Sequence, residues 1–526
     1  MKRRTTKTQR LPDLRQGALL EVTPSTKVDE VSAPKAVVFE EGDSARLYVG
    51  NVPLWKYLED GPERWVLRLG QLLEGLDWAR FEAAYKPGGR PPLHPRRVVG
   101  LVMYALVQQQ SSLRQMESLA RRDVGAWWLA GGLTPDHTTL ARFVRRHEEL
   151  LSTEFFVSLT AQIAKQLGIK PADLAIDGTV TLAAASAVSA LKREALEKVA
   201  VEATETLAAA RASGAEPAAL ARAEAHVKAL EKAHVVLEER EAANKAAGKP
   251  IDKLQVSPVE PEAVVQPLKR SSDYGLAYKP VVGAHSSGLV VAQNLSPSSE
   301  TEHVEDLIAQ HQAVFGEPAK RALLDSGFCS IGLLTTCVAM GLDVLCPTGQ
   351  GGKPRRGRKG HFGKDRFTYL EAGDRVVCPS NAEMTPGIVL KDRRGLEYRE
   401  FRTPACATCP LRTGCTSSRQ RVYKRYVGDE LKDAMTELLR HPAARAAYAR
   451  RSVIVEPVFA RMAAAGFTRF RRRGRVRART ELALRCSAQN IALFVRRTRS
   501  GFVAICLIWR PDASWRLTVI NVNAPT

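Results

Sequence analysis

The sequence contains no long hydrophobic run and no export signal. Its longest apolar stretch, residues 98–107, is far shorter than the roughly 20 residues that a transmembrane helix needs. Residues 1–7 are basic, but the apolar core of a secretory signal does not follow them. Nine cysteines, an odd number, in a chain without such a signal favour a reducing compartment. We therefore expect a cytoplasmic protein that does not associate with membranes.

Acidic residues are scarce relative to basic ones. The chain has 526 residues, of which 78 are Lys or Arg and 56 are Asp or Glu, for a formal net charge of +22. A basic excess of this size favours a polyanionic partner such as nucleic acid. The alternative is an ordinary basic protein whose charge serves solubility. At this length we expect at least two domains.

Two short apolar runs each end in an aspartate that is followed by a glycine-containing turn. Residues 174–176 lead to Asp177, and residues 322–324 lead to Asp325; a third acid, Glu456, also follows apolar residues. Oxygen ligands of this kind suit hard divalent ions, and two such ions can clamp both oxygens of a phosphodiester displacement. A single aspartate after an apolar run is more often a turn former or a helix cap. A catalytic role for these acids therefore depends on the order of the elements around them.

The region before these acids predicts a helical domain. Within residues 46–170, the leucines of residues 69–76 form an apolar stripe at helical spacing. Short helices that begin at capping residues, near 111–119 and 134–143, are typical of a DNA-binding domain. A plain helical bundle explains them nearly as well. Residues 1–45 are polar and basic, and we expect them to form a mobile tail.

Residues 171–500 predict an α/β catalytic domain that carries two insertions. The first insertion, residues 189–249, is rich in Ala, Glu, Lys and Leu and predicts a helical hairpin, which either mediates dimer contact or projects into solvent. A β-hairpin, a helix, a strand, a helix and a strand are then expected in this order: 278–293, 301–314, the strand before Asp325, 330–340 and 343–346. Residues 501–526 form a strand-like C-terminal tail.

Four cysteines lie in the second insertion, residues 348–425. Cys406 and Cys409 form a Cys-x-x-Cys pair, which Cys378 precedes and Cys415 follows. Such a set matches a tetrahedral thiolate zinc site. A redox pair is disfavoured because Cys406 does not open a helix after a strand. Reduced cysteines without a metal are the alternative.

Two clusters of basic residues have few acidic neighbours and predict contact with phosphate groups. One lies in a Gly-rich loop at 349–366 and the other at 466–499. Their basic residues are Lys353, Arg355, Arg356, Arg358 and Lys359 in the loop, and Arg469, Arg471, Arg472, Arg473, Arg475, Arg477 and Arg479 in the second cluster. A solvated surface is the alternative for both.

Four motifs, in this order along the chain, resemble those of bacterial insertion-sequence transposases of the DDE type. They are Gly-Arg-Pro…Pro-Arg-Arg within 89–97, Ser-Ser-Leu-Arg-Gln-Met-Glu at 111–117, Pro-Asp-His-Thr-Thr-Leu-Ala-Arg-Phe at 135–143 and Ala-Ile-Asp-Gly-Thr at 175–179. The resemblance covers roughly residues 50–500, in the branch with a helical N-terminal domain. It implies an RNase H-like catalytic domain, Mg²⁺ or Mn²⁺, binding to terminal inverted repeats and target DNA as a homodimer, and a place beside the bacterial nucleoid.

The C-terminal part resembles the last catalytic helix of the same family. Tyr448, Arg451 and Glu456 match its Tyr, Arg and Glu signature, and the resemblance implies DNA contact for Tyr448 and Arg451. Pro457 fits a first helical turn or a kink rather than a regular helix interior. Ala463 stands where the family usually carries a Lys.

Together these features predict a DDE transposase that cleaves DNA strands and transfers them to a target. Asp177 would bridge two Mg²⁺ ions, Asp325 would bind one of them and Glu456 the other. Glu481 is the reserve candidate for the third acid. Two alternatives remain: a decayed transposase copy that only binds DNA, and a host metal-dependent nuclease of the same fold.

Overall fold

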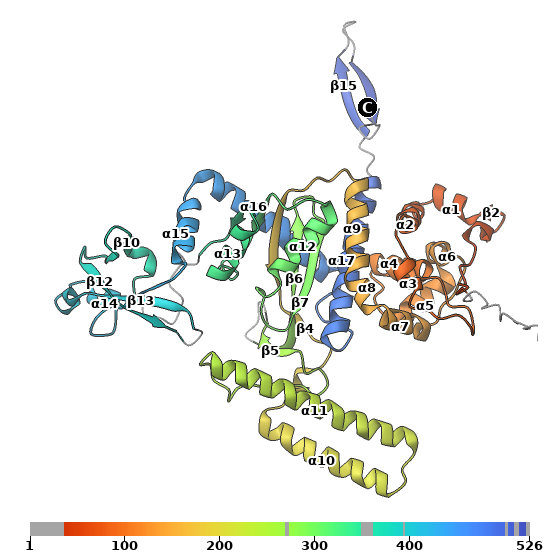
Figure 1. Ribbon diagram of the computed structural model, residues 1–526. Helices are drawn as coiled ribbons and strands as arrows, with labels where there is room; N and C mark the ends of the chain where they lie inside the picture. The colour runs from red at the N-terminus through yellow and green to blue at the C-terminus, as the bar shows by residue number, and fades with distance from the viewer. Residues whose placement is uncertain are drawn as a thin grey trace, which may run out of the picture.

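The computed structural model describes residues 36–268, 273–348, 361–392, 395–499, 503–509 and 515–521. The first part of the chain is helical, as its apolar stripes predict (Figure 1). Its elements are β1 (Tyr48–Val49), β2 (Val52–Pro53), α1 (Leu54–Asp60), α2 (Trp65–Glu74), α3 (Ala79–Glu82), α4 (Pro95–Val107), α5 (Leu113–Arg122), α6 (Val124–Ala130), α7 (His137–Arg146), α8 (Glu148–Ser152) and α9 (Glu154–Gln166).

Polar side chains cap several of these helices. Ser112 and Gln115 form a capping box at the start of α5, in which each side chain accepts a hydrogen bond from the other residue's backbone N–H. Asp123 and Asp136 cap α6 and α7 in a similar way. Each cap satisfies a backbone donor that the helix itself leaves without a partner. Leu69, Leu72 and Leu73 of the leucine stripe are buried on α2, and Leu76 follows the helix and is half-buried.

A central sheet of seven strands follows. Its strands are β3 (Asp173–Gly178), β4 (Thr181–Leu182), β5 (Val264–Pro267), β6 (Tyr274–His285), β7 (Val290–Ser296), β8 (Arg321–Leu323) and β9 (Val344–Leu345). The main path runs β7-β6-β3-β8-β9, in which β6 is antiparallel to β3 and β7, while β3, β8 and β9 are parallel. The short strands β4 and β5 pair with the first half of β6. The predicted β-hairpin is therefore β6–β7.

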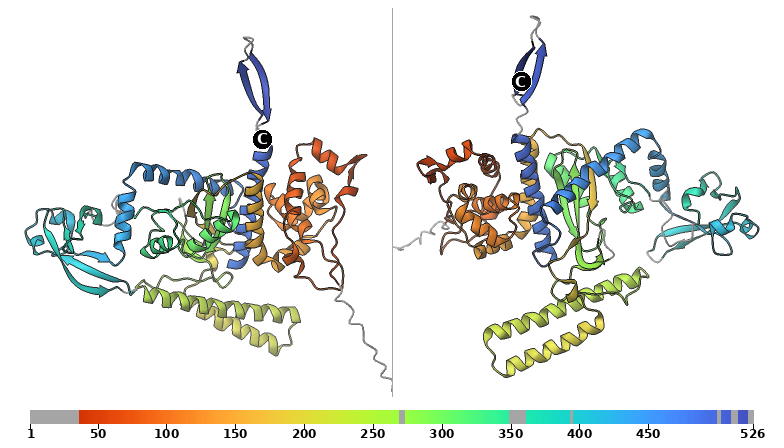
Figure 2. Two further views of the ribbon diagram at one scale, coloured as in Figure 1. Left: turned by 45° about the horizontal axis from the view of Figure 1, so that its top comes forward. Right: turned by 180° about the vertical axis from the view of Figure 1, so that it is seen from behind.

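Helices cover both faces of this sheet (Figure 2). On one face, Leu174 and Ile176 of β3 belong to the core shared with α9 and with α12 (Val304–Phe315). On the other face, Ala175 belongs to the core shared with α16 (Pro442–Ala464) and α17 (Arg475–Arg499). Successive strand residues point to opposite faces, so odd-numbered residues of β3 lie on the α16 face.

The two insertions form separate projections (Figure 1). The predicted helical hairpin is present as α10 (Arg193–Ala212) and α11 (Pro217–Ala246), which pack on each other around a small core that includes Leu196 and Leu230. Arg240 ties α11 to the chain that re-enters the sheet, because its guanidinium donates to four backbone carbonyls between residues 255 and 263.

The second insertion contains a five-stranded antiparallel sheet that the sequence did not predict. Its strands are β10 (Thr368–Leu370), β11 (Arg375–Val377), β12 (Glu383–Lys391), β13 (Glu397–Arg402) and β14 (Tyr423–Tyr426), with α14 (Arg412–Cys415) between the last two. The helix α13 (Ile331–Ala339) precedes the insertion and contributes to the main core, and α15 (Asp429–Leu438) follows the insertion. The strands are short and interrupted by Gly, Pro and charged residues, which hides their alternation. The predicted DNA contacts Lys353, Arg355, Arg356, Arg358 and Lys359 lie outside the described residues.

The C-terminal part returns to the central sheet through α16 and α17. Pro457 lies inside α16, so the helix continues through it rather than beginning there. After α17, β15 (Val503–Trp509) and β16 (Trp515–Asn521) pair as an antiparallel hairpin. None of the helices in the described part of the chain is both long and apolar enough to cross a membrane.

Candidate active site

Asp177 and Asp325 lie at the carboxyl ends of two neighbouring parallel strands. The register pairs Ala175 of β3 with Leu323, the last residue of β8. Asp177 follows two residues later in β3. Asp325 follows two residues after the end of β8, where the backbone N–H of Leu324 still donates to the carbonyl of Leu345 in β9 at 3.0 Å and keeps the chain beside the sheet. Ala175 and Leu323 both belong to the core beneath α16. By strand alternation the two carboxylates then lie at the same edge and on the same face of the sheet.

Tyr448 of α16 lies near both acids. Burial raises the pKa of Tyr448; the Arg451 charge opposes this increase, and the charges of Asp325 and Asp177 add to it. The buried Cys346, which follows β9, donates to the backbone carbonyl of Asp325 at 3.1 Å. The two carboxylates thus lie near one side chain of the helix that covers this face of the sheet.

Arg451 of α16 forms an ion pair with Asp177. Its Nη2 atom lies 3.0 Å from Asp177 Oδ1, and the two side chains are only 11% and 16% exposed. The geometry is not that of a hydrogen bond: Nε and Nη2 of Arg451 are buried and have no hydrogen-bond acceptor among the described residues. No sequence signal predicted this pairing, because the two residues are far apart in the chain and belong to different motifs.

Glu456 belongs to the same helix, but its side chain is exposed. At about 100° per residue, it projects about 140° away from Arg451 around the helix axis. Among the described residues, no three His, Cys, Asp or Glu side chains are placed to hold one metal ion. The structure therefore brings Asp177 and Asp325 together and leaves Glu456 on the neighbouring helix as the third candidate.

The reserve candidate Glu481, on α17, is occupied by internal contacts. Its Oε2 atom accepts hydrogen bonds from the backbone N–H groups of Arg471 at 2.8 Å and Arg472 at 3.2 Å. Its Oε1 atom pairs with Arg485 at 3.3 Å. With both oxygens engaged and the residue 8% exposed, Glu481 holds the turn before α17 in place.

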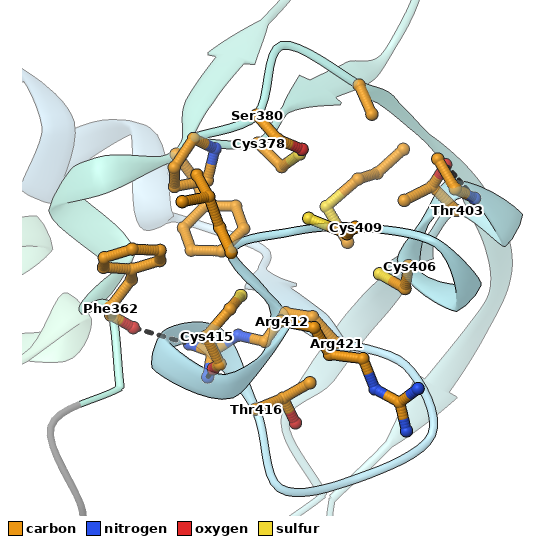
Figure 3. Close-up of a pocket in the computed structure, with 16 residues that line it drawn as sticks. Phe362, Cys378, Ser380, Thr403, Cys406, Cys409, Arg412, Cys415, Thr416 and Arg421 are labelled. Carbon is orange, nitrogen blue, oxygen red and sulfur yellow. Dashed lines mark hydrogen bonds between the residues drawn. The ribbon is translucent and has the colours of Figure 1, made fainter.

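The four predicted zinc ligands gather around one small cavity of about 20 Å³ beside the five-stranded sheet (Figure 3). Cys378, Cys406, Cys409 and Cys415 all line it, together with Phe367 and other apolar side chains. Burial raises the pKa of Cys415, and the charges of the other three cysteines raise it further. All four thiols are free, and as they lie, no three His, Cys, Asp or Glu side chains of the described residues could hold a metal ion together.

Comparison with known protein families gives two matches. The model described as "Transposase DDE domain" matches residues 377–494, and the model described as "Transposase domain (DUF772)" matches residues 59–146. The first match contains the four cysteines together with Tyr448, Arg451 and Glu456. The chain belongs to the insertion-sequence DDE transposases. Searches of curated proteins and of solved structures gave no match.

The family gives the general fold, reaction class and partner of the transposase. A DDE domain implies an RNase H-like fold and a DNA-cleaving enzyme, and the family binds DNA and generally uses divalent metal ions. The matched DDE segment begins after Asp177 and Asp325, so their assignment rests on the geometry described above. The DUF772 match covers α2 to α7 of the helical region.

The arginine run of the transposase is divided between internal contacts and surface. Arg472, predicted to contact DNA, is instead held against Glu148 of α8 at 2.6 Å, and burial lowers its pKa. Arg475 donates from Nε to a carbonyl of β7 at 3.3 Å. Arg471 and Arg473 are exposed. For this exposed pair, contact with DNA stays a prediction.

Proposed function

We propose that this transposase cleaves DNA at the ends of its element and joins the freed ends to target DNA in metal-dependent phosphoryl transfer. The observation that carries the proposal is the convergence of Asp177 and Asp325 at adjoining strand ends, beneath the helix that carries Tyr448, Arg451 and Glu456. The strand order is β7-β6-β3-β8-β9, and β6 runs antiparallel to both of its neighbours, β3 and β7. This arrangement supports an RNase H-like catalytic domain.

The donor set fits hard divalent ions. Asp177 already lies 3.0 Å from a cationic group, and adjacent carboxylates repel each other unless a cation neutralises them. Asp177 and Asp325 would hold Mg²⁺ or Mn²⁺, and Glu456 would join them once its side chain turns toward the sheet. Such ions activate water and stabilise the leaving oxygen.

The chemistry proceeds in two displacements. In the first, a water oxygen bonds to phosphorus at the element's end, the bond to the 3′ oxygen breaks, and a 3′-hydroxyl and a 5′-phosphate result. In the second, that 3′-hydroxyl attacks a phosphodiester of target DNA and displaces its 3′ oxygen. The protein forms no covalent bond to DNA in this scheme; its residues hold and orient the phosphate.

DNA would be held by exposed basic residues and by the helical N-terminal region. Arg471 and Arg473 are exposed beside α17, and such side chains release counterions when they bind phosphates. Arg469 is exposed as well, but its Nη1 atom donates to the carbonyls of Ala183 at 3.3 Å and Ala185 at 3.4 Å. Two copies of the chain would bring both terminal repeats together as a homodimer.

A cleavage assay tests this function. Full-length protein with Mg²⁺ and DNA carrying the gene's own flanking sequences should produce nicks at the element ends, and Asp177→Ala, Asp325→Ala and Glu456→Ala should each abolish them while binding to the repeats persists. Glu481→Ala serves as the control for the third acid. Loss of cleavage in Glu481→Ala, with Glu456→Ala active, would reassign that ligand. Binding without cleavage by the wild-type protein would support the decayed copy, and cleavage without end specificity would support the host nuclease.

We also propose that Cys378, Cys406, Cys409 and Cys415 bind one structural Zn²⁺ ion. Four thiols around one cavity provide the right ligand type and number, and their side chains would have to move inward to reach a common ion. Metal analysis should find about one zinc per chain, the stoichiometry of a four-thiolate site. Absence of zinc, with all four thiols rapidly titratable in folded protein, would contradict the proposal.

A further inference from the structure

Two adjacent arginines of α16 each pair with a different aspartate of β3, and only the Arg451 pair involves a residue of the proposed metal site. Arg451 Nη2 lies 3.0 Å from Asp177 Oδ1, whereas Arg450 Nη1 lies 3.7 Å from Asp173 Oδ2. The Arg451 side chain is 11% exposed and that of Arg450 is 60% exposed. The chain thus contains a buried pair at the site and an open pair outside it.

The buried pair of Arg451 and Asp177 lacks the hydrogen bonds that such a pair usually forms. Nε and Nη2 of Arg451 have no hydrogen-bond acceptor among the described residues, although buried donors are normally paired. An arginine placed for stability alone would be expected to form hydrogen bonds with its carboxylate in a fork-like geometry. Arg451 instead supplies charge to Asp177 without that geometry, so the pair is one that a stronger cation can replace.

We propose that Arg451 is an exchangeable counter-charge: it neutralises Asp177 while the site lacks metal, and it leaves Asp177 when a divalent ion binds. This inference rests on the proposed role of Asp177 as a metal ligand. Without Arg451, Asp177 and Asp325 would repel each other across adjoining strand ends. Once displaced, the guanidinium presents its unpaired N–H groups to an anion, and the phosphate of the bound strand is the acceptor of matching geometry.

The exchange predicts that Arg451 opposes metal binding. In the DNA-free full-length protein, Arg451→Gln should bind Mn²⁺ about tenfold more tightly than wild type or tighter still, since a nearby positive charge disfavours a dication. Arg451→Lys, which keeps the charge, should stay close to wild type. Arg450→Gln, the matched control, should leave the affinity unchanged. Titration calorimetry or electron paramagnetic resonance of free Mn²⁺ measures all four.

The outcomes separate this inference from the function on which it rests. Unchanged or weaker Mn²⁺ binding in Arg451→Gln would overturn the exchange. If Asp177→Asn leaves wild-type Mn²⁺ binding intact, the proposed metal site itself is wrong.

A second measurement needs no variant and holds even where Arg451→Gln fails to fold. Saturating Mn²⁺ should increase modification of Arg451 by a dicarbonyl reagent, mapped by mass spectrometry, and should leave the exposed Arg450 equally reactive. Equal protection of Arg451 with and without Mn²⁺ would overturn the exchange.

Discussion

The central sheet and the five-stranded sheet of the second insertion differ in the size of the hydrophobic core that stabilises them. The central sheet is covered by helices on both faces, and its core draws on residues from α9 to α17. Among the described residues, the hydrophobic core of the insertion comprises five buried side chains, Phe367, Val376, Met384, Phe401 and Tyr423, with Cys378 and Cys415 packed at its edge. A core this small seldom suffices without a metal or a disulfide.

This difference in core size accounts for where the carboxylates and the thiols of the two proposed metal sites lie. The large core can hold a buried, imperfectly satisfied pair such as Asp177–Arg451, because many other contacts fix the strands around it. The small core has cysteines at its edge, where a metal would supply the missing stability. Carboxylates at the central sheet thus serve catalysis in our proposal, while thiolates at the insertion serve folding.

The largest expected effect is loss of the insertion fold. Cys409→Ser or removal of zinc should leave the five-stranded sheet open to proteolysis, while the central sheet stays resistant. Limited proteolysis with mass mapping measures both regions in one sample. Cys486→Ser, a substitution at a fully buried thiol of α17, serves as the control and should not expose the insertion. If the insertion resists proteolysis equally with and without the metal, then zinc does not stabilise it and its small core suffices.

The next largest effect is expected when one buried side chain of each core is truncated to alanine. Phe401→Ala removes the largest fully buried side chain of the small core and should cost about 3–5 kcal/mol, enough to unfold the insertion alone. Leu323→Ala in β8 should cost about 2–5 kcal/mol but leave the central sheet folded. Hydrogen exchange resolves the two regions; simultaneous opening of both sheets in Phe401→Ala would show that they fold as one unit.

A pH effect should fall on the central body. Burial lowers the pKa of His311, which lies beneath the central sheet, from an ordinary 6.5 to about 4. Its unfolded form therefore takes up a proton first, so stability is complete above pH 6.5 and is lost as pH falls toward 4, by roughly 3 kcal/mol. Urea unfolding at pH 7 and pH 4.5 should show a smaller difference in His311→Leu. The exposed His226→Gln should behave as wild type.

The smallest effect concerns DNA affinity. Arg471→Gln and Arg473→Gln together should reduce the slope of log K against log salt by up to about one unit per lost phosphate contact. Arg222→Gln, an exposed substitution on the helical hairpin, should leave the slope unchanged. Binding to a duplex at several salt concentrations provides the measurement. An unchanged slope in the double variant would mean that these side chains only face solvent.

Local patterns determined much of this architecture. Apolar runs ending at Asp177 and Asp325 became β3 and β8, the Pro217 break became the turn between α10 and α11, and capping residues marked α5 and α7. These features follow from side-chain period and turn chemistry, which act over a few residues. The sequence motifs also indicated the transposase family, which the two family matches confirm.

Only the tertiary structure decided which distant side chains meet. It paired Arg451 with Asp177 and placed Arg472 against Glu148. It also formed five short strands of the insertion into a sheet whose alternation is too irregular to read. Such contacts depend on how packed elements orient whole faces, and a face is shared by residues far apart in the chain. Residue order by itself therefore indicates which groups are present but not which of them neutralise one another.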